Sequence, residues 1–251
     1  MYMGRVSASP ERDVLRELTG ARVLITGLSA STGVDLARTF ADLKTRLVVH
    51  TNDLSPEVTE LIALLSQSAG EIKLYTDPIA TADASVRFAQ NAAQAYGGLD
   101  AVINLAEISH SELSAVGCDQ SLETLVSKKI APLAYLTKVT ANRMRVVLSE
   151  GLILNVLSMP HPRSGREAAI ASLARTALAA MTQAEARNWA DNGIRINAIG
   201  PRVVTDGQTA AGASLANEPG IAALAIYLAS HRGRALSGHI FDAEGVIERG
   251  D

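Results

Sequence analysis

The segment Val23-Leu-Ile-Thr-Gly-Leu-Ser-Ala-Ser-Thr-Gly33 contains the strongest local signal in this chain, because its glycines stand where a short apolar strand would turn into a helix. At such a turn, backbone N–H groups and the helix N-terminus can face a phosphate group. Ser31 breaks the pattern, since a glycine there would let the backbone approach the phosphates more closely. Taken alone, the segment fits either a phosphate-binding loop or an ordinary tight strand-to-helix turn.

On both sides of this turn, short apolar runs alternate with longer segments of helical periodicity. Runs such as 23–25 and 47–49 are almost continuously apolar, which is typical of parallel strands covered on both faces. The alternation predicts an α/β fold, with a doubly wound parallel sheet of seven strands and helices on both faces. Strands are expected at 21–26, 46–51, 71–75, 100–104, 151–157, 194–199 and 237–242, and helices near 33–43, 55–69, 81–96, 120–143, 166–191 and 219–230.

The composition indicates one soluble domain. The chain has 251 residues, 47% of them hydrophobic and 20% charged, and a formal net charge of −3. We expect a single domain over residues 19–251 after an N-terminal extension of residues 1–18. The absence of a basic stripe and of an apolar run of about 20 residues argues against nucleic acid or membrane as a partner. Cys118 is the only cysteine, so no disulfide framework and no metal site are expected, and we expect a cytoplasmic protein.

Four further motifs follow the glycine turn in order. They are Asp77 after the third expected strand, Asn104-Leu-Ala-Glu107 after the fourth, Asn155-Val-Leu-Ser158 after the fifth, and Ile194-Arg-Ile-Asn-Ala-Ile-Gly-Pro201. Together with the turn, they resemble the short-chain dehydrogenase/reductase family, and the pattern is most similar to the 3-oxoacyl-acyl-carrier-protein reductases. The resemblance covers about residues 18–246. It implies a Rossmann-type domain and NAD or NADP as the cofactor.

Carried onto this sequence, the resemblance implies a set of site residues. Ser158 matches the catalytic serine, which holds the substrate oxygen. Preference between NAD and NADP is not readable, because the second strand ends at Thr51 with neither an acidic residue for a ribose diol nor an arginine for a 2′-phosphate. The cofactor-binding positions implied by the family are Gly27, Ser29, Ser31, Gly33, Thr51, Asp77, Asn104, Ala106, Arg175, Pro201 and Thr205.

The tyrosine and lysine of the family's catalytic motif are missing. The tyrosine, which exchanges a proton with the substrate, would fall at Ala171, and the lysine at Arg175. Misalignment does not rescue the pair, because no tyrosine lies between Tyr135 and Tyr227 and no lysine follows Lys138. General acid–base catalysis needs a titratable group, and the methyl group of an alanine has no proton to donate.

Other departures crowd the expected cofactor site. Leu105 and Glu107 replace an asparagine and the glycine of the family's NNAG motif, and Arg202 replaces a glycine near the expected nicotinamide position. The family's helix asparagine is absent near Lys128, and the stretch after Thr205 is shorter than the usual substrate lid. Because Ser31 crowds the pyrophosphate and Glu107 places a negative charge beside its phosphates, we expect dinucleotide binding to be weakened or lost.

Three functions remain open at this point. The first, favoured by the loss of both tyrosine and lysine, is a catalytically impaired scaffold or oligomer subunit. The second is an active NAD(P)-dependent carbonyl or alcohol oxidoreductase that uses Ser158 with a substitute acid, such as His161, or with a bound water. The third is a binding protein for an acyl or aromatic ligand in the former substrate cleft. Fold alone does not choose among them.

Two long helices are expected to join subunits. Pro132 predicts a kink in the helix near 120–143. In the helix at 166–190, spacings of three and four predict one inward face made of Ile170, Leu173, Ala174, Ala177, Met181 and Ala184. Small residues also lie beside that face, at Ala168, Ser172, Ala179 and Ala180. As in the family, we expect a dimer or tetramer through both helices, either of identical chains or with an active relative.

Overall fold

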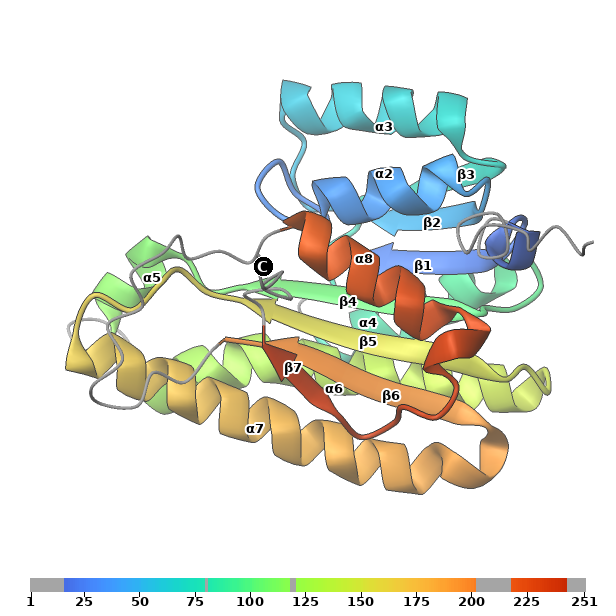
Figure 1. The fold of residues 1–251 in the computed structure, drawn as a ribbon. Helices are drawn as coiled ribbons and strands as arrows, with labels where there is room; N and C mark the ends of the chain where they lie inside the picture. Colours follow the sequence, from blue (N-terminus) through green and yellow to red (C-terminus); the bar gives the residue numbers. More distant parts are fainter. Residues whose placement is uncertain (1–15, 80, 118–120, 202–217, 243–251) are drawn as a thin grey trace, which may run out of the picture.

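A computed structural model of the protein describes residues 16–79, 81–117, 121–201 and 218–242. These residues form one seven-stranded sheet in the order β3-β2-β1-β4-β5-β6-β7, and all neighbouring strands are parallel (Figure 1). The strands are β1 (Arg22–Thr26), β2 (Arg46–His50), β3 (Glu71–Tyr75), β4 (Ala101–Glu107), β5 (Gly151–Ser158), β6 (Ile194–Gly200) and β7 (Ile240–Asp242). The expected doubly wound α/β fold is confirmed.

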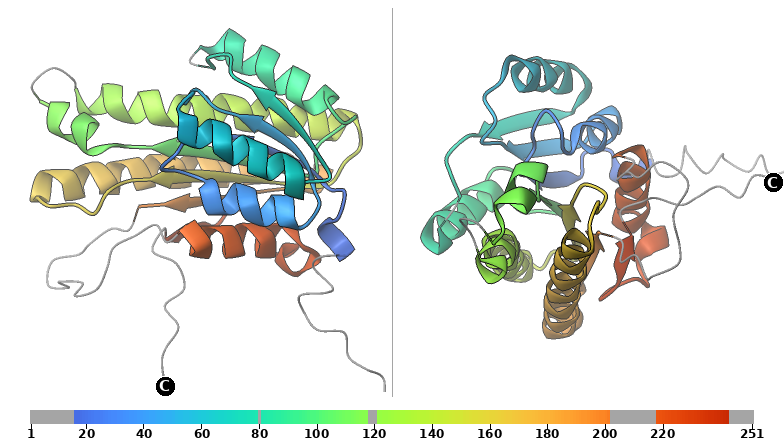
Figure 2. Two further views of the ribbon diagram at one scale, coloured as in Figure 1. Left: turned by 90° about the horizontal axis from the view of Figure 1, so that it is seen from above. Right: turned by 90° about the vertical axis from the view of Figure 1, so that its left-hand side faces the viewer.

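Helices cover both faces of the sheet (Figure 2). They are α2 (Val34–Asp42), α3 (Pro56–Ser68), α4 (Ala82–Gln94), α5 (His110–Ala115), α6 (Leu122–Val146), α7 (Gly165–Trp189) and α8 (Glu218–Ala229). Alternate strand residues face opposite layers: Val23 and Ile25 pack in the cluster with α2, α3 and α8, while Leu24 packs in the cluster with α4 and α6. None of the helices formed by the described residues could cross a membrane.

The expected strands and helices are all present, and their ends differ by a few residues. Strand β4 continues past Asn104 to Glu107 and therefore brings Leu105 and Glu107 to the carboxyl edge of the sheet. Helix α5 is not among the helices expected from the sequence. Its signal is a capping box, in which Ser109 and Glu112 bond each other's backbone N–H groups.

The inward face predicted for α7 is wrong in part. Ile170 and Ala174 are buried, but Leu173 is 41% exposed and Ala184 is also exposed. Ala177 and Met181 are only partly buried. Small residues lie on both sides of this helix, so apolarity alone could not fix its rotation. The residues that do face inward are Ile170, Ala171, Ala174, Leu178, Thr182, Glu185 and Ala186.

The helix α6 runs without interruption through Pro132, as one helix rather than two. Residues 17 and 18 pack against the domain: Leu18 is buried, and a carboxylate oxygen of Glu17 lies 2.6 Å from Nδ1 of His231. These two residues of the expected extension therefore contact the core domain.

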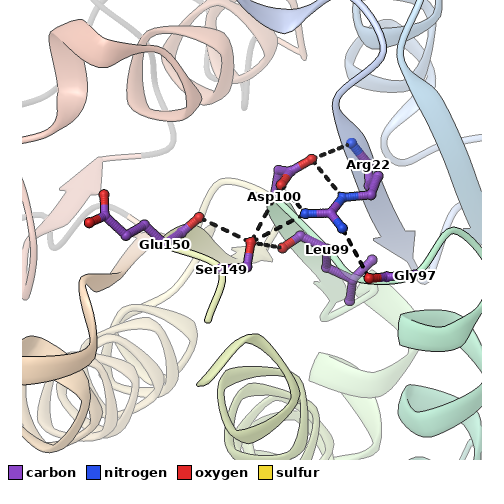
Figure 3. Close-up of polar contacts among 6 residues, drawn as sticks. All are labelled: Arg22, Gly97, Leu99, Asp100, Ser149 and Glu150. Atoms are coloured by element: carbon purple, nitrogen blue, oxygen red, sulfur yellow. Dashed lines mark hydrogen bonds and ion pairs between the residues drawn. The ribbon is translucent and has the colours of Figure 1, made fainter. Parts of the chain in front are cut away.

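An ionic network closes the amino end of the central strands (Figure 3). The backbone N–H and the Nε of Arg22 both donate to Oδ2 of Asp100, at 2.8 and 3.0 Å, and the guanidinium also donates to the hydroxyl of Ser149 at 3.3 Å. Burial alone would raise the pKa of Asp100, but these bonds and the charge of Arg22 outweigh it and hold that pKa below its usual value. The network joins β1 to the chain segments that begin β4 and β5, at the edge opposite the glycine turn.

Polar side chains also cross the buried middle of the sheet. Thr26 donates to Oδ1 of Asn104 at 3.1 Å, Asn104 donates to Oδ1 of Asn155 at 2.9 Å, and Asn155 donates to the hydroxyl of Thr137 at 3.0 Å. All four residues are at most 1% exposed. Since buried polar groups need partners, this chain of bonds fixes β1, β4 and β5 against α6.

Candidate functional site

The strand order reverses between β1 and β4, and this is where open α/β sheets form a ligand-binding crevice. A cleft of about 210 Å³ lies there, at the carboxyl ends of the strands. Its apolar wall consists of Leu36, Leu105, Val156, Met159, Pro160 and Ile221, and its other lining residues are Ser31, Thr32, Gly33, Glu107, Ser158 and Glu218.

The two glycines of the β1–α2 turn are needed for its close packing against β4. Gly27 and Gly33 both have positive φ, 76° and 87°, a conformation that costs glycine little. A Cβ at Gly27 would collide with the carbonyl oxygen of Leu105, and a Cβ at Gly33 would collide with the side chain of Leu105. Leu105 therefore fills the space directly beneath the turn.

Carboxylates of the chain itself occupy the hydrogen-bond donors of this turn. The N–H of Ala30 donates to Oδ2 of Asp53 at 2.9 Å. The hydroxyls of Ser31 and Thr32 donate to Oε2 of Glu107, at 3.2 and 2.8 Å. The N–H from Ala30 and further bonds from Ser55 lower the pKa of Asp53, which keeps its carboxylate charged.

The first turn of α2 is also occupied. The N–H of Gly33 donates to Oε1 of Glu218, and the N–H of Asp35 donates to Oε2 of Glu218 at 3.1 Å. Gly33 is the N-cap of α2 and provides no side-chain cap of its own. Glu218 therefore supplies an acceptor for donors that a helix N-terminus otherwise leaves unsatisfied.

Some of the sequence-predicted residues meet at this edge of the sheet. Ser31, Gly33 and Ser158 line the cleft, and Gly27, Ser29 and Ala106 line a shallower hollow beside it. At the end of β5, the hydroxyl of Ser158 is 3.4 Å from the carbonyl oxygen of Ala106, to which it donates.

Three other residues predicted to bind the cofactor form hydrogen bonds outside the cleft. Thr51 is buried and its hydroxyl donates to the carbonyl of Leu28 at 2.6 Å, while Asn104 belongs to the buried chain of polar bonds. Asp77 is exposed, and its backbone carbonyl accepts a hydrogen bond from His50 at 2.9 Å. None of these three side chains lines the cleft.

The two positions of the missing catalytic pair lie on α7. Ala171 is only 1% exposed. The guanidinium of Arg175 donates to the backbone carbonyl of Pro201 at 3.0 Å and pairs with Asp242 at 2.7 Å, so it joins α7 to the ends of β6 and β7. The alternative acid, His161, is exposed and is not among the cleft residues. Thr205, Arg202 and Cys118 lie outside the described residues.

Two residues at the turn, Asp53 and Glu218, were not among the site residues predicted from the sequence. Asp53 follows β2, where only the ribose-binding position was considered. Glu218 precedes a proline, which is a recognisable helix start. Its contact with Gly33 joins positions far apart in the chain, however, and no local pattern reveals such a contact.

Comparison with known proteins identifies the family. A family described as short chain dehydrogenase matches residues 21–218, and the chain therefore belongs to the short-chain dehydrogenase family. Among characterised relatives, it is 25% identical to glucose 1-dehydrogenase 2 of Bacillus subtilis over 193 residues, which cover 75% of this chain and 74% of the relative. It is 26% identical to galactitol 2-dehydrogenase of Agrobacterium fabrum over 185 residues, covering 74% and 70%.

Solved structures agree on the fold. A short chain dehydrogenase from Mycobacterium smegmatis superposes with a TM-score of 0.72 at 19% identity, covering 93% of this chain and 95% of that one. A hydroxysteroid dehydrogenase from Escherichia coli gives a TM-score of 0.70 at 21% identity, covering 94% and 99%. These likenesses extend over nearly the whole chain and support the Rossmann-type fold.

Members of this family generally bind NAD or NADP, and the donors seen here can be compared with that requirement. A pyrophosphate at the β1–α2 turn needs free N–H and hydroxyl donors and a favourable charge. Here Asp53, Glu107 and Glu218 accept from those donors, and Arg175 is paired with Asp242. In this arrangement, the site does not fit an anionic dinucleotide.

Proposed function

We propose that this protein is a catalytically impaired member of the short-chain dehydrogenase family that acts as a scaffold or oligomer subunit. The observation that carries the proposal is Ala171, which stands at the family position of the proton-donating tyrosine. Arg175 at the lysine position retains a positive charge, but its guanidinium forms an ion pair with Asp242 and donates a hydrogen bond to the backbone carbonyl of Pro201. Guanidinium and ammonium groups also differ in shape and in acidity.

The lining of the cleft offers no ready substitute for the tyrosine. Among the described cleft residues, the side chains that carry a carboxyl group are Glu107 and Glu218, and both accept hydrogen bonds from the glycine turn. Ser158 could still hold a substrate oxygen. A serine alone lacks the acid that contributes roughly 10²–10⁴-fold to such reactions.

The proposal includes weakened or lost dinucleotide binding. Ser31 adds bulk at the turn, and Glu107 places a negative charge beside a ligand that already carries two anionic phosphates. Calorimetric titration with NAD(H) and NADP(H) at moderate salt tests this part. We expect no binding in the micromolar range, and micromolar affinity for either cofactor would contradict it.

The activity part is tested by steady-state oxidation and reduction with both cofactors. Suitable substrates are a 3-oxoacyl thioester, simple carbonyl compounds, and glucose and galactitol, which the names of two relatives suggest. We expect no appreciable turnover. Turnover that disappears in Ser158→Ala or His161→Ala would instead support the alternative, an active oxidoreductase with a substitute acid.

Restoring the missing pair provides a further test. We expect the double variant Ala171→Tyr with Arg175→Lys to remain inactive, because the turn and the cleft have changed as well. Ala171 is also buried, so a tyrosine ring there must displace packed neighbours at a cost of about 1–3 kcal/mol. High activity in this variant would show that the loss of the pair was the only important change.

A further inference from the structure

The carboxylate of Glu218 lies where the N-terminus of α2 presents its free donors. It accepts from the backbone N–H groups of Gly33 and Asp35, and these groups carry the partial positive charge of the helix dipole. An anionic ligand at the glycine turn would use the same donors. A backbone N–H provides a single hydrogen, so a ligand phosphate and Glu218 compete for it.

Two packed helices hold Glu218 in this position. Glu218 is the first residue of α8, and α8 packs against α2. Ile221, Ala222 and Ala225 of α8 belong to the same buried apolar cluster as Leu36 and Phe40 of α2. Placed in the first turn of α8, the carboxylate is also favoured by the dipole of its own helix. Because the two helices pack together, the negative charge of Glu218 lies at the N-terminus of α2 even when no ligand is bound.

The other two carboxylates at the turn also occupy hydrogen-bond donors that an anionic ligand would need. Asp53 accepts from the N–H of Ala30, and Glu107 accepts from the hydroxyls of Ser31 and Thr32. No lysine or arginine is among the described residues that line the cleft. A pyrophosphate entering here would meet three negative charges and would have to take its hydrogen bonds from donors already in use.

From these contacts we infer that Glu218 is an autoinhibitory internal anion, which fills the phosphate-binding position at the N-terminus of α2 and excludes anionic dinucleotides from the cleft. The inference rests on the proposed function, because it supplies a physical cause for the weakened cofactor binding. It also goes further than the proposed function, since it implies that the N–H donors of Gly33 and Asp35 become available to an anion when one side chain is removed.

The test is binding of inorganic pyrophosphate and of NADH to four proteins: wild type, Glu218→Ala, Glu218→Gln and Glu57→Ala. Glu57 is the matched control, because it also lies in the first turn of a helix, α3, but is exposed and is not among the residues that line the cleft. The glutamine variant removes the charge and keeps an oxygen that can accept one N–H. It therefore covers the case in which the alanine variant does not fold.

We expect Glu218→Ala to bind pyrophosphate roughly tenfold or more tightly than wild type, with the glutamine variant in between and Glu57→Ala like wild type. The melting temperature of Glu218→Ala should be lower than that of wild type without added anion, and should rise as pyrophosphate is added. Wild type should show no such rise.

The possible failures are distinguishable. If folded Glu218→Ala and Glu218→Gln bind pyrophosphate and NADH no better than wild type, the inference is wrong, whereas the proposed weak cofactor binding stands. If wild type binds NADH in the micromolar range and both Glu218 variants bind it more tightly, the proposed loss of binding is wrong and the competition by Glu218 is supported. Micromolar binding that is the same in all four proteins contradicts both.

Discussion

His50 ends β2 with no exposed surface, and its ring lies 5.0 Å from that of Phe88 between centroids. Its Nε2 is 2.9 Å from the backbone carbonyl of Asp77. Since a carbonyl can only accept, Nε2 carries the hydrogen of the neutral ring. The other nitrogen, Nδ1, is buried and has no hydrogen-bond partner among the residues that the structure describes. Burial lowers the pKa of His50, although the carbonyl of Asp77 partly opposes the shift.

This environment predicts a pH dependence of stability. The pKa of His50 is lower in the folded protein than in the unfolded chain, where it is about 6.5. Below that pH the unfolded chain therefore binds more protons than the folded protein does. The free energy of unfolding should therefore decrease with falling pH below about 6.5. Urea unfolding across this range should show a smaller decrease for His50→Phe than for wild type.

The control for this prediction is His161→Gln, since His161 is exposed. Other groups also titrate at low pH, so the decisive quantity is the difference between each variant and wild type. If His50→Phe loses stability with pH as steeply as wild type does, the buried imidazole is not the source of the dependence.

Leu105 of β4 packs directly against both glycines of the β1–α2 turn. A Cβ at Gly33 would meet the side chain of Leu105, which can be shortened, while a Cβ at Gly27 would meet the backbone carbonyl of Leu105, which cannot. The two glycines share the same left-handed conformation. Their substitution by alanine should therefore respond differently to a change at position 105.

We expect Gly33→Ala and Gly27→Ala each to lower the free energy of unfolding by at least about 1–3 kcal/mol, and Leu105→Ala by about 2–5 kcal/mol. The double variant Gly33→Ala with Leu105→Ala should lose less stability than the two single variants lose together, and the difference should be a coupling energy of about 0.5–3 kcal/mol. Gly27→Ala should remain additive or nearly so. Denaturant unfolding of the two double-mutant cycles measures this, and equal coupling in both would contradict the assigned contacts.

For the whole molecule, the unpartnered side of α7 is the most informative surface. Between Arg166 and Arg187, the exposed residues of this helix are uncharged: Ala169, Leu173, Thr176, Ala180, Gln183 and Ala184. The adjacent helix α6 carries Tyr135, which is 42% exposed. A helix that faces water alone normally has a charged outer side. Family members are commonly homo-oligomers, so we predict a dimer or tetramer through α6 and α7.

Light scattering at micromolar concentration should show an oligomer for wild type and a smaller species for Ala180→Arg. The matched control is Ala63→Arg, because Ala63 is an exposed alanine on α3, which packs on the opposite face of the sheet. A monomeric wild type would exclude the interface. A wild-type oligomer unaffected by Ala180→Arg would place the contact elsewhere.

Much of this molecule follows from local sequence patterns. Alternating strands and helices predicted the parallel sheet, because apolar periodicity reports which residues must leave water. The ordered motifs around Gly27 and Asn155 identified the family, and the absence of any tyrosine or lysine near Ala171 and Arg175 could be established by counting alone. These features lie within short segments, or in their order along the chain.

Contacts between distant segments could not be read in this way. The rotation of α7 was mispredicted at Leu173, because alanines on both sides gave no amphipathic signal, and packing against β6 set the rotation instead. Asn104 became part of a buried polar chain because three strands meet beside it. Glu218 reaches Gly33 only after α8 has packed on α2. Which donors at the turn remain free is therefore a property of the assembled fold, since the carboxylates that occupy them come from distant parts of the chain.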